Sequence, residues 1–159
     1  MSSDRTSRRA ALAGLAALAG CGFSPALAPG GAAGRLRGQV ALETPDTVPG
    51  FALRRQLADR LGQGAGPYRL TVALATATEP ATIDLAGRTT RVNLVGDAVW
   101  TLAREGAVIA QDTASSFTSY SATGTTVATQ AASDDAEARL SVLLADRIVA
   151  DLLLLDLAA

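Results

Sequence analysis

The feature that most restricts the fold is an alternation of small or apolar residues with other residues between positions 92 and 102. Successive side chains of a strand point to opposite faces of a sheet, so this period of two predicts a strand with one buried face. The residues predicted to share that face are Val92, Leu94, Gly96, Ala98, Trp100 and Leu102. The intervening positions include Arg91, Asn93, Asp97 and Thr101, which predict the other face.

The same period appears on both sides of this strand. It runs from Tyr68 to Leu74 and again from Ala107 to about Tyr120. Tight turns are predicted at Ala86-Gly87 and at Arg104-Glu105-Gly106, so the three strands form an antiparallel meander with one buried face. Pro80 interrupts the first of them, which indicates an edge position or a bulge.

A shorter strand and a helix precede the meander. The alternation of Leu36, Gly38, Val40 and Leu42 predicts the strand, and breaks are expected at Thr44-Pro45-Asp46 and at Pro49-Gly50. The helix is predicted from Phe51 to Leu61, because a leucine recurs every four residues. Gly62 is placed to cap the carboxyl end of this helix.

A long helix is predicted at the end of the chain, beginning at Ala128 or Ser133 and ending at Leu155. Ser133 fits an N-cap, because acidic residues follow it and the helix dipole favours acids in a first turn. The acidic run therefore has a structural explanation that needs no metal or catalytic role. The residues predicted on the apolar face are Leu140, Leu144, Ile148, Leu152 and Leu155.

The order of elements is strand, helix, three strands, helix. Each helix has one apolar stripe and the sheet has one apolar face. The simplest arrangement that buries all three is an α+β fold, with two helices packed on one face of a four-stranded, mostly antiparallel sheet.

The amino terminus has the pattern of an exported lipoprotein. Arg5, Arg8 and Arg9 precede a short apolar run, Ala10 to Gly20, which is too short to span a membrane as a helix. The run ends at Leu18-Ala19-Gly20-Cys21, a lipobox, and Cys21 is the only cysteine of the chain. We expect residues 1–20 to be a signal peptide and Cys21 to carry fatty acyl chains. A twin-arginine route and an ordinary basic signal both remain open.

The remaining chain divides into two parts. Residues 21–35 are rich in glycine, proline and alanine, which predicts a flexible tether. Residues 36–159 then form a single domain. No later apolar stretch has the length of a transmembrane helix, so attachment by lipid is expected.

Composition argues against most enzyme classes. The chain has no histidine and no lysine, and its one cysteine is assigned to lipid, so the usual general bases, thiolate nucleophiles and nitrogen or sulfur metal sites are missing. A hydrolase that uses only carboxylates would need two acids in one cleft, for which Asp84 and Asp97 are the candidates. We expect no enzyme, no cofactor besides the covalent lipid, and no nucleic-acid binding, because the net charge is −1.

Several segments of the chain form a recognisable set in their order and spacing. They are Cys21-Gly22-Phe23-Ser24-Pro25, Leu53-Arg54-Arg55-Gln56-Leu57, Arg60-Leu61-Gly62, Tyr68-Arg69-Leu70-Thr71-Val72, Arg91-Val92-Asn93-Leu94-Val95-Gly96, Trp100-Thr101-Leu102, Ser119-Tyr120-Ser121-Ala122-Thr123-Gly124, Asp134-Asp135-Ala136 and Arg139-Leu140. Together they resemble the LptE family of lipopolysaccharide-assembly lipoproteins, in its alphaproteobacterial form. The resemblance covers almost the whole chain after the signal peptide.

The resemblance implies a location and partners. It implies a non-enzymatic lipoprotein on the periplasmic side of the outer membrane, which plugs the lumen of an LptD-type β-barrel. It also implies assistance to lipopolysaccharide transport, with lipopolysaccharide itself as a ligand. Gly22 after the cysteine fits outer-membrane sorting. A different function stays open: an auxiliary lipoprotein of another envelope lipid-transport system of the ABC type.

Two groups of residues are candidates for these contacts. Better-studied relatives offer lysine to lipid A phosphates, whereas here only arginine can serve, and Arg88 and Arg91 flank the first hairpin tip. These arginines can equally be solvated hairpin charges. The second group is an uncharged, hydroxyl-rich strand end that suits a polar barrel lumen, although an ordinary polar strand end is the alternative. Its residues are Ser115, Ser116, Thr118, Ser119 and Tyr120.

Overall fold

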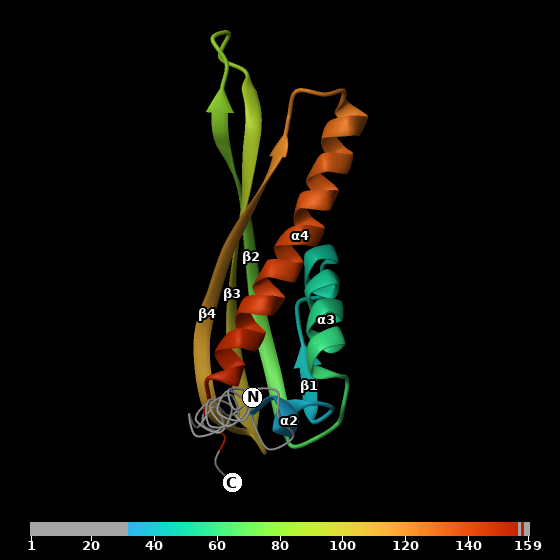
Figure 1. Cartoon of the computed structure of the whole chain (residues 1–159), viewed down its shortest axis with the longest axis vertical. Coiled ribbons are helices and arrows are strands. Elements are labelled where there is room, and N and C mark those ends of the chain that lie inside the picture. The colour runs from blue at the N-terminus through green and yellow to red at the C-terminus, as the bar shows by residue number, and fades with distance from the viewer. Residues whose placement is uncertain (1–31, 156, 158–159) are drawn as a thin grey trace, which may run out of the picture.

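Four strands form one sheet in the order β1-β2-β3-β4, and the two long helices lie on one of its faces (Figure 1). The computed structural model describes residues 32–155 and 157. The elements are α2 (Ala32–Leu36), β1 (Val40–Glu43), α3 (Val48–Leu61), β2 (Tyr68–Ile83), β3 (Thr89–Arg104), β4 (Ala107–Ser121) and α4 (Thr126–Leu153). β1 pairs with β2 in parallel, and the other two pairs are antiparallel. The predicted α+β architecture is confirmed.

The first strand is shorter than predicted. Leu36 belongs to α2 and is fully buried, and Gly38 lies in a turn with a φ of 70°. The backbone N–H of Gly38 donates to the carbonyl of Leu61, which ties this turn to the end of α3. The alternation therefore becomes a strand only from Val40 onward. Residues 32–35, which were expected in the tether, also lie in α2.

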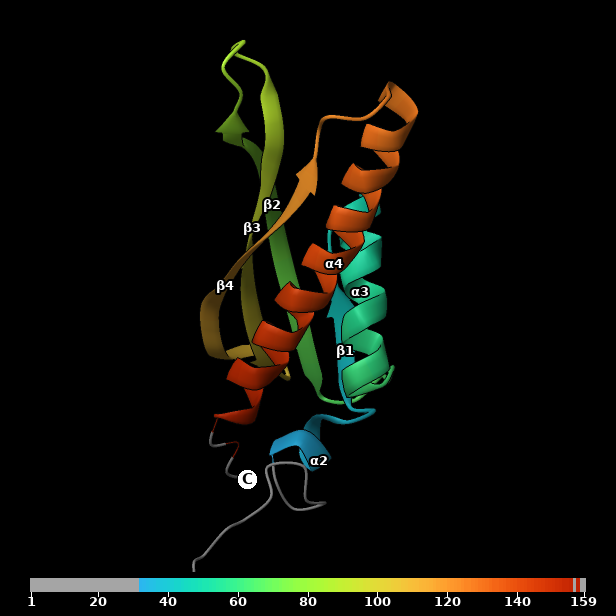
Figure 2. The same ribbon diagram turned by 45° about the horizontal axis from the view of Figure 1, so that its top comes forward.

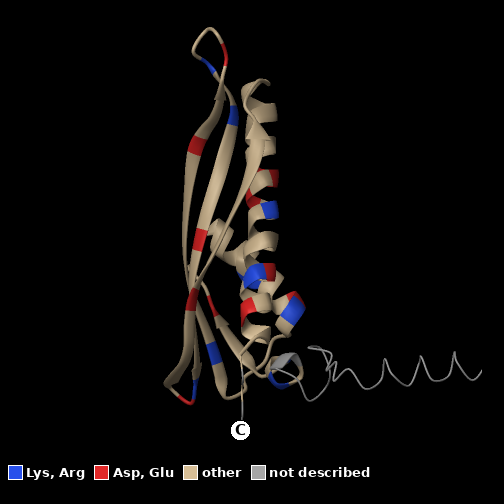
Figure 3. Cartoon of the chain, turned by 60° about the vertical axis from the view of Figure 1, so that its left-hand side comes forward, with Lys and Arg blue, Asp and Glu red and all other residues tan. Residues whose placement is uncertain are grey.

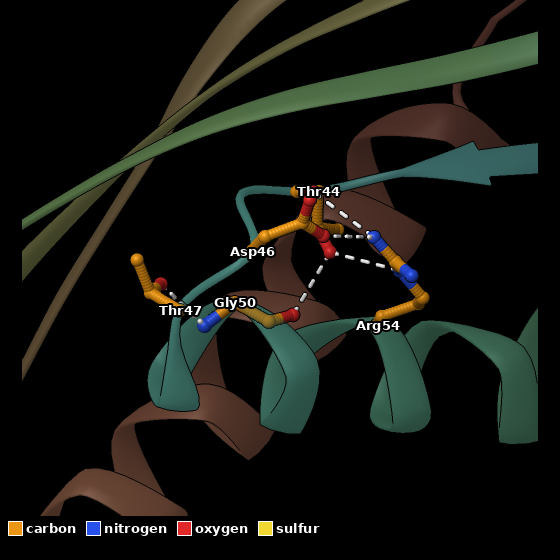
Figure 4. Close-up of polar contacts among 5 residues, drawn as sticks. All are labelled: Thr44, Asp46, Thr47, Gly50 and Arg54. Atoms are coloured by element: carbon orange, nitrogen blue, oxygen red, sulfur yellow. Dashed lines mark hydrogen bonds and ion pairs between the residues drawn. The ribbon is translucent and has the colours of Figure 1, made fainter.

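Helix α3 begins three residues before the predicted start. The Thr47 hydroxyl caps it by accepting from the N–H of Gly50, and Pro49 fits the first turn because an N–H is not needed there. Pro49-Gly50 is thus a helix start and not a break. Figure 4 shows Thr47 beside the N–H of Gly50. A Cβ on Gly50 would lie 2.2 Å from the carbonyl oxygen of Pro45, so only glycine fits this corner. Gly62 caps the other end as predicted, with a φ of 75°.

Strand β2 continues through Pro80 with a bulge. The register with β3 shifts between Pro80 and Ile83, while β1 covers only Tyr68–Thr71 on the other edge of β2. Pro80 therefore lies where no described strand needs its missing N–H, and the expected edge position and bulge are both confirmed. The β3–β4 turn also follows the prediction, because Glu105 and Gly106 have φ values of 52° and 88°.

Helix α4 begins seven residues before Ser133. Thr125 is the N-cap, and its hydroxyl accepts from the N–H of Ala128, so the predicted cap at Ser133 is wrong. The first turns of α4 carry no apolar stripe, so the recurrence of apolar residues in the sequence did not predict them as helix. Farther along, Leu140, Leu144, Ile148 and Leu152 are buried as predicted, whereas Leu155 is half-buried.

The core lies between α4, α3 and the inner face of the sheet. Five of the six residues predicted on the buried face of β3 are buried, and Val92 is half-buried near the strand end. Helix α4 packs closely on β3 at Gly96, where a Cβ would lie 2.9 Å from Leu140 Cδ2. The small residue in the alternation thus permits the close packing of the helix.

The molecule is long and narrow. α2 and the β3–β4 turn lie at one end, and the β2–β3 hairpin tip and the start of α4 lie at the other (Figures 1 and 2). The β2–β3 tip projects beyond α4.

Candidate functional site

The end of the molecule opposite α2 gathers polar side chains from three segments. We call it the distal end: the β2–β3 hairpin tip, the end of β4 and the start of α4. A hollow of about 360 Å³ there is lined by Thr82, Thr90, Arg91, Ser119, Tyr120 and Ser121. A second of about 380 Å³ is lined by Tyr120, Ala122, Gly124, Thr126, Thr129, Gln130 and Ser133. Hydroxyl groups dominate both.

The two predicted arginines have different surroundings. Arg88 pairs with Asp84 at 2.8 Å, and Asp84 also accepts from the backbone N–H groups of Ala86 and Arg88 at 2.9 Å each. The hydrogen bond from the Arg88 N–H, followed by that from its side chain, lowers the pKa of Asp84, although desolvation partly opposes this. The guanidinium of Arg88 is thus engaged in stabilising the turn.

Arg91 is exposed at the rim of the first hollow. It pairs in register with Thr82 on β2 and with Ser121 on β4, so its side chain projects from the centre of a three-stranded patch. Within residues 32–155, Arg91 forms no ion pair. The guanidinium is therefore available for an anionic ligand.

The five predicted β4 residues do not form one surface. Thr118 is 7% exposed and donates to the carbonyl of Ala136 in α4 at 2.9 Å, so it is a packing residue and cannot face a partner. Ser116 and Tyr120 lie on the same, helix-covered face and are half-buried. Only Ser115 and Ser119 lie on the opposite face, because successive residues of a strand alternate.

Ser115 and Ser119 bond to their cross-strand neighbours. Ser115 donates to Asp97 at 2.6 Å, and Ser119 donates to Asn93 at 2.8 Å. These bonds hold the hydroxyl groups on the open sheet face, which is the face that no helix covers. Their contact with a partner remains a prediction.

The open sheet face also carries an apolar area that the sequence patterns did not single out. Phe117 is 61% exposed and pairs in register with Val95, which in turn pairs with Ala77. A hollow of about 360 Å³ beside them is lined by Glu79, Asn93, Val95, Ser115, Ser116 and Phe117. The sequence does contain a signal for this apolar area. Phe117 directly precedes Thr118, and neighbouring residues of a strand face opposite sides, so an inward-facing Thr118 requires an outward-facing Phe117. Figure 3 shows few charged residues along the three long strands.

The two candidate catalytic acids do not converge. Asp84 lies in the hairpin turn, and Asp97 lies on β3 eight residues from Thr89, or about 26 Å at the rise of a strand. The described residues also contain no cluster of side chains suited to a metal ion.

Among helices α2, α3 and α4, none combines the length and apolarity needed to cross a membrane. Cys21 and the rest of the predicted signal peptide lie outside the described residues.

The fold is shared with solved lipoprotein structures. A Caulobacter crescentus CB15 protein that is described as a lipoprotein matches with a TM-score of 0.62 and 22% identity, over 77% of this chain and 92% of that one. The minor lipoprotein of Acinetobacter baumannii matches with a TM-score of 0.58 and 20% sequence identity, over 73% of this chain and 90% of that one. Rare lipoprotein B of Shewanella oneidensis matches with a TM-score of 0.56 and 15% sequence identity, over 71% of this chain and 92% of that one. At these identities the likeness concerns the fold.

Sequence comparison gives the more specific result. No curated protein sequence matches the chain. The model of the LptE family, described as lipopolysaccharide-assembly, matches residues 38–152. This range extends from the turn before β1 almost to the end of α4. Because the match includes all four strands and both long helices, the chain belongs to the LptE lipopolysaccharide-assembly family.

Proposed function

We propose that the protein is a non-enzymatic lipoprotein, anchored through Cys21 on the periplasmic side of the outer membrane, that plugs an LptD-type barrel and assists lipopolysaccharide transport. The family match over residues 38–152, which include the four strands and nearly all of both long helices, is the observation that carries the proposal. The lipobox at Leu18–Cys21 supports the anchor.

The surface of the domain supports the barrel as partner. A plug needs a narrow body whose surface suits a polar lumen. The molecule is long and narrow (Figure 2), and the open sheet face carries short, mostly uncharged side chains. Ala73, Ala75 and Ala77 on β2 and Thr113 and Ser115 on β4 are all exposed there. Such a surface approaches another protein closely without burying unpaired charges.

The distal end supports lipopolysaccharide as ligand. Arg91 carries an uncommitted guanidinium at the rim of a hydroxyl-lined hollow, and the fork of an arginine suits phosphate oxygens. Arg88 forms an ion pair with Asp84 within the turn, so it could bind a phosphate only by giving up this ion pair.

The test is a charge placed on the open sheet face. Ser119→Arg should weaken recovery of the barrel with the affinity-tagged protein, because a bulky cation replaces a small hydroxyl at the contact. Ala138→Arg on the exposed side of α4 is the matched control and should leave recovery unchanged. Circular dichroism checks that both variants fold. Full recovery of the barrel with Ser119→Arg would remove the open sheet face from the interface.

A further inference from the structure

The β2–β3 hairpin tip exposes two large aliphatic side chains. Leu85 is fully exposed and Ile83 is 59% exposed, at the extreme end of a hairpin that projects beyond the body of the protein (Figures 1 and 2). Packing within the described chain leaves both side chains exposed, so they are available to a partner.

The turn beneath them is well ordered by its own hydrogen bonds. Asp84 accepts from the N–H groups of Ala86 and Arg88, and Gly87 has a φ of 77°. The N–H of Gly87 also donates to the carbonyl of Asp84 at 3.0 Å. The tip therefore presents Leu85 on a fixed turn. Binding there loses less conformational entropy than ordering a loose loop would.

The charges of the tip suit a lipid surface better than an apolar protein pocket. Asp84 is the acid closest to the apolar residues, and its ion pair with Arg88 compensates its charge at 2.8 Å. Arg91, which forms no ion pair with the described residues, adds a positive charge farther down the hairpin, opposite Thr82. Glu79 is exposed on the same face and brings the net charge of residues 79–91 to zero, but Arg91 still offers an unpaired guanidinium to a phosphate.

The spacing between the apolar and cationic groups matches the depth of a membrane interface. Arg91 pairs with Thr82, and Leu85 lies three residues beyond Thr82 in the turn after β2, so at the rise of a strand the separation is at most about 10 Å. Interfacial elements bury their apolar side chains about 5–10 Å into the boundary between headgroups and acyl chains. With Arg91 at the level of the phosphates, Leu85 would reach the acyl chains.

We propose that the β2–β3 tip is a lipid-inserting element. Ile83 and Leu85 enter the acyl region of a lipid assembly with phosphate-bearing headgroups, while Arg91 contacts a phosphate at its surface. The inference rests on the proposed function, since it assigns the apolar part of the same lipid ligand to specific residues. It makes the tip a wedge between lipid molecules as well as a phosphate contact.

The test measures the depth of the tip in vesicles. The full chain carries Cys21→Ser, so that the only thiol is an introduced one, and a bimane fluorophore is attached at Ala86→Cys in the tip. The matched control carries the fluorophore at Ala107→Cys, beside the β3–β4 turn at the opposite end. The vesicles contain phosphatidylcholine and phosphatidic acid, with a nitroxide lipid as the quencher. Quenching is expected at position 86 and not at position 107.

Variants then separate the two kinds of contact. Removing the aliphatic side chains with Ile83→Ser and Leu85→Ser together should weaken vesicle partitioning of the tip at least about tenfold, while Val108→Ser at the opposite turn should not. Arg91→Gln should weaken partitioning into phosphatidic acid vesicles more than partitioning into pure phosphatidylcholine, because choline offsets the phosphate charge of phosphatidylcholine.

Each opposite result overturns the proposal. Equal quenching at both turns, or none at position 86, would contradict insertion of the tip. Loss of barrel recovery in the serine variant without any quenching would assign the tip to a protein pocket instead. A protein that recovers a barrel but shows no quenching refutes only this inference. A quenched tip in a protein that recovers no barrel refutes only the proposed function.

Discussion

Trp100 is the largest fully buried side chain, and it lies on the face of β3 that the sequence pattern assigned to the core. Its burial could be predicted because alternation fixes the facing of every residue in a strand. Truncating a buried aromatic side chain removes its contacts and leaves a cavity. Trp100→Ala should therefore lower the free energy of unfolding by about 3–5 kcal/mol, as measured by chemical denaturation.

A conservative variant tests whether packing is the cause. The indole N–H of Trp100 has no hydrogen-bond partner among the described residues, so Trp100→Phe loses volume but no hydrogen bond. Its loss of stability should be less than half that of Trp100→Ala. An unchanged midpoint of unfolding for Trp100→Ala would contradict the assigned facing of β3.

Thr118 shows what composition alone could not reveal at the residue scale. A run of serine and threonine at a strand end looks uniformly polar, yet alternation divides it between two faces. Thr118 turns toward α4 and bonds to Ala136, whereas Ser119 turns to the open sheet face. Phe117 lies among serine and threonine residues, so the hydroxyl-rich pattern of this segment does not indicate an exposed aromatic side chain.

At the scale of elements, the strands and the apolar stripes of the helices followed from periodicity, while helix starts did not. Both α3 and α4 begin earlier than predicted, because a threonine caps each one before the apolar period starts. Pro49 resembled a break, although a proline in a first turn favours a helix. Gly38 resembled a strand residue because a glycine fits either an alternation or a turn.

The β2–β3 turn gives a prediction at this scale. Because hydrogen bonds and the Arg88 ion pair favour the ionised form, the folded pKa of Asp84 lies below its usual value. The stabilisation of the folded turn by the Asp84 carboxylate is therefore fully present above about pH 4. It is lost as the pH falls through the pKa that Asp84 has in the folded protein. Asp84→Ala should speed amide hydrogen exchange at Ala86 and Arg88 at neutral pH.

The matched variant separates hydrogen bonding from charge. Asp84→Asn keeps a side-chain oxygen for the two amides but loses the ion pair, so its exchange rates should lie between those of the wild type and Asp84→Ala. Acidification through the folded pKa of Asp84 should lower the protection of these two amides relative to their intrinsic exchange rates in the wild type, and should leave that protection unchanged in Asp84→Ala. Identical exchange rates in all three proteins at neutral pH would show that the carboxylate does not hold the turn.

At the scale of the whole molecule, the sequence predicted how the two helices and the sheet combine, since packing both helices on one sheet face is the simplest arrangement that buries the three apolar faces together. It did not predict the length of the molecule or the projection of the hairpin, which depend on how far β2 and β3 extend past α4. The site at the distal end followed only in part, because Arg88 is engaged by Asp84 while Arg91 is not.

Lipid attachment is a prediction about the whole molecule as well. Cells that express the wild type and are fed a fatty-acid analogue should incorporate the label into the protein, because Cys21 ends a lipobox. Cys21→Ser should abolish the labelling, whereas Ser24→Ala, a nearby change outside the lipobox, should preserve it. Persistent labelling of Cys21→Ser would refute the anchor.

The central claim is that this protein assembles with an outer-membrane barrel that transports lipopolysaccharide. Its most direct measurement is purification of the tagged, full-length wild type from detergent-solubilised outer membranes, followed by identification of what accompanies it. We expect a large β-barrel of the LptD type in a fixed ratio to the protein, together with lipopolysaccharide. Recovery of an inner-membrane ABC-type transporter in place of the barrel would contradict it.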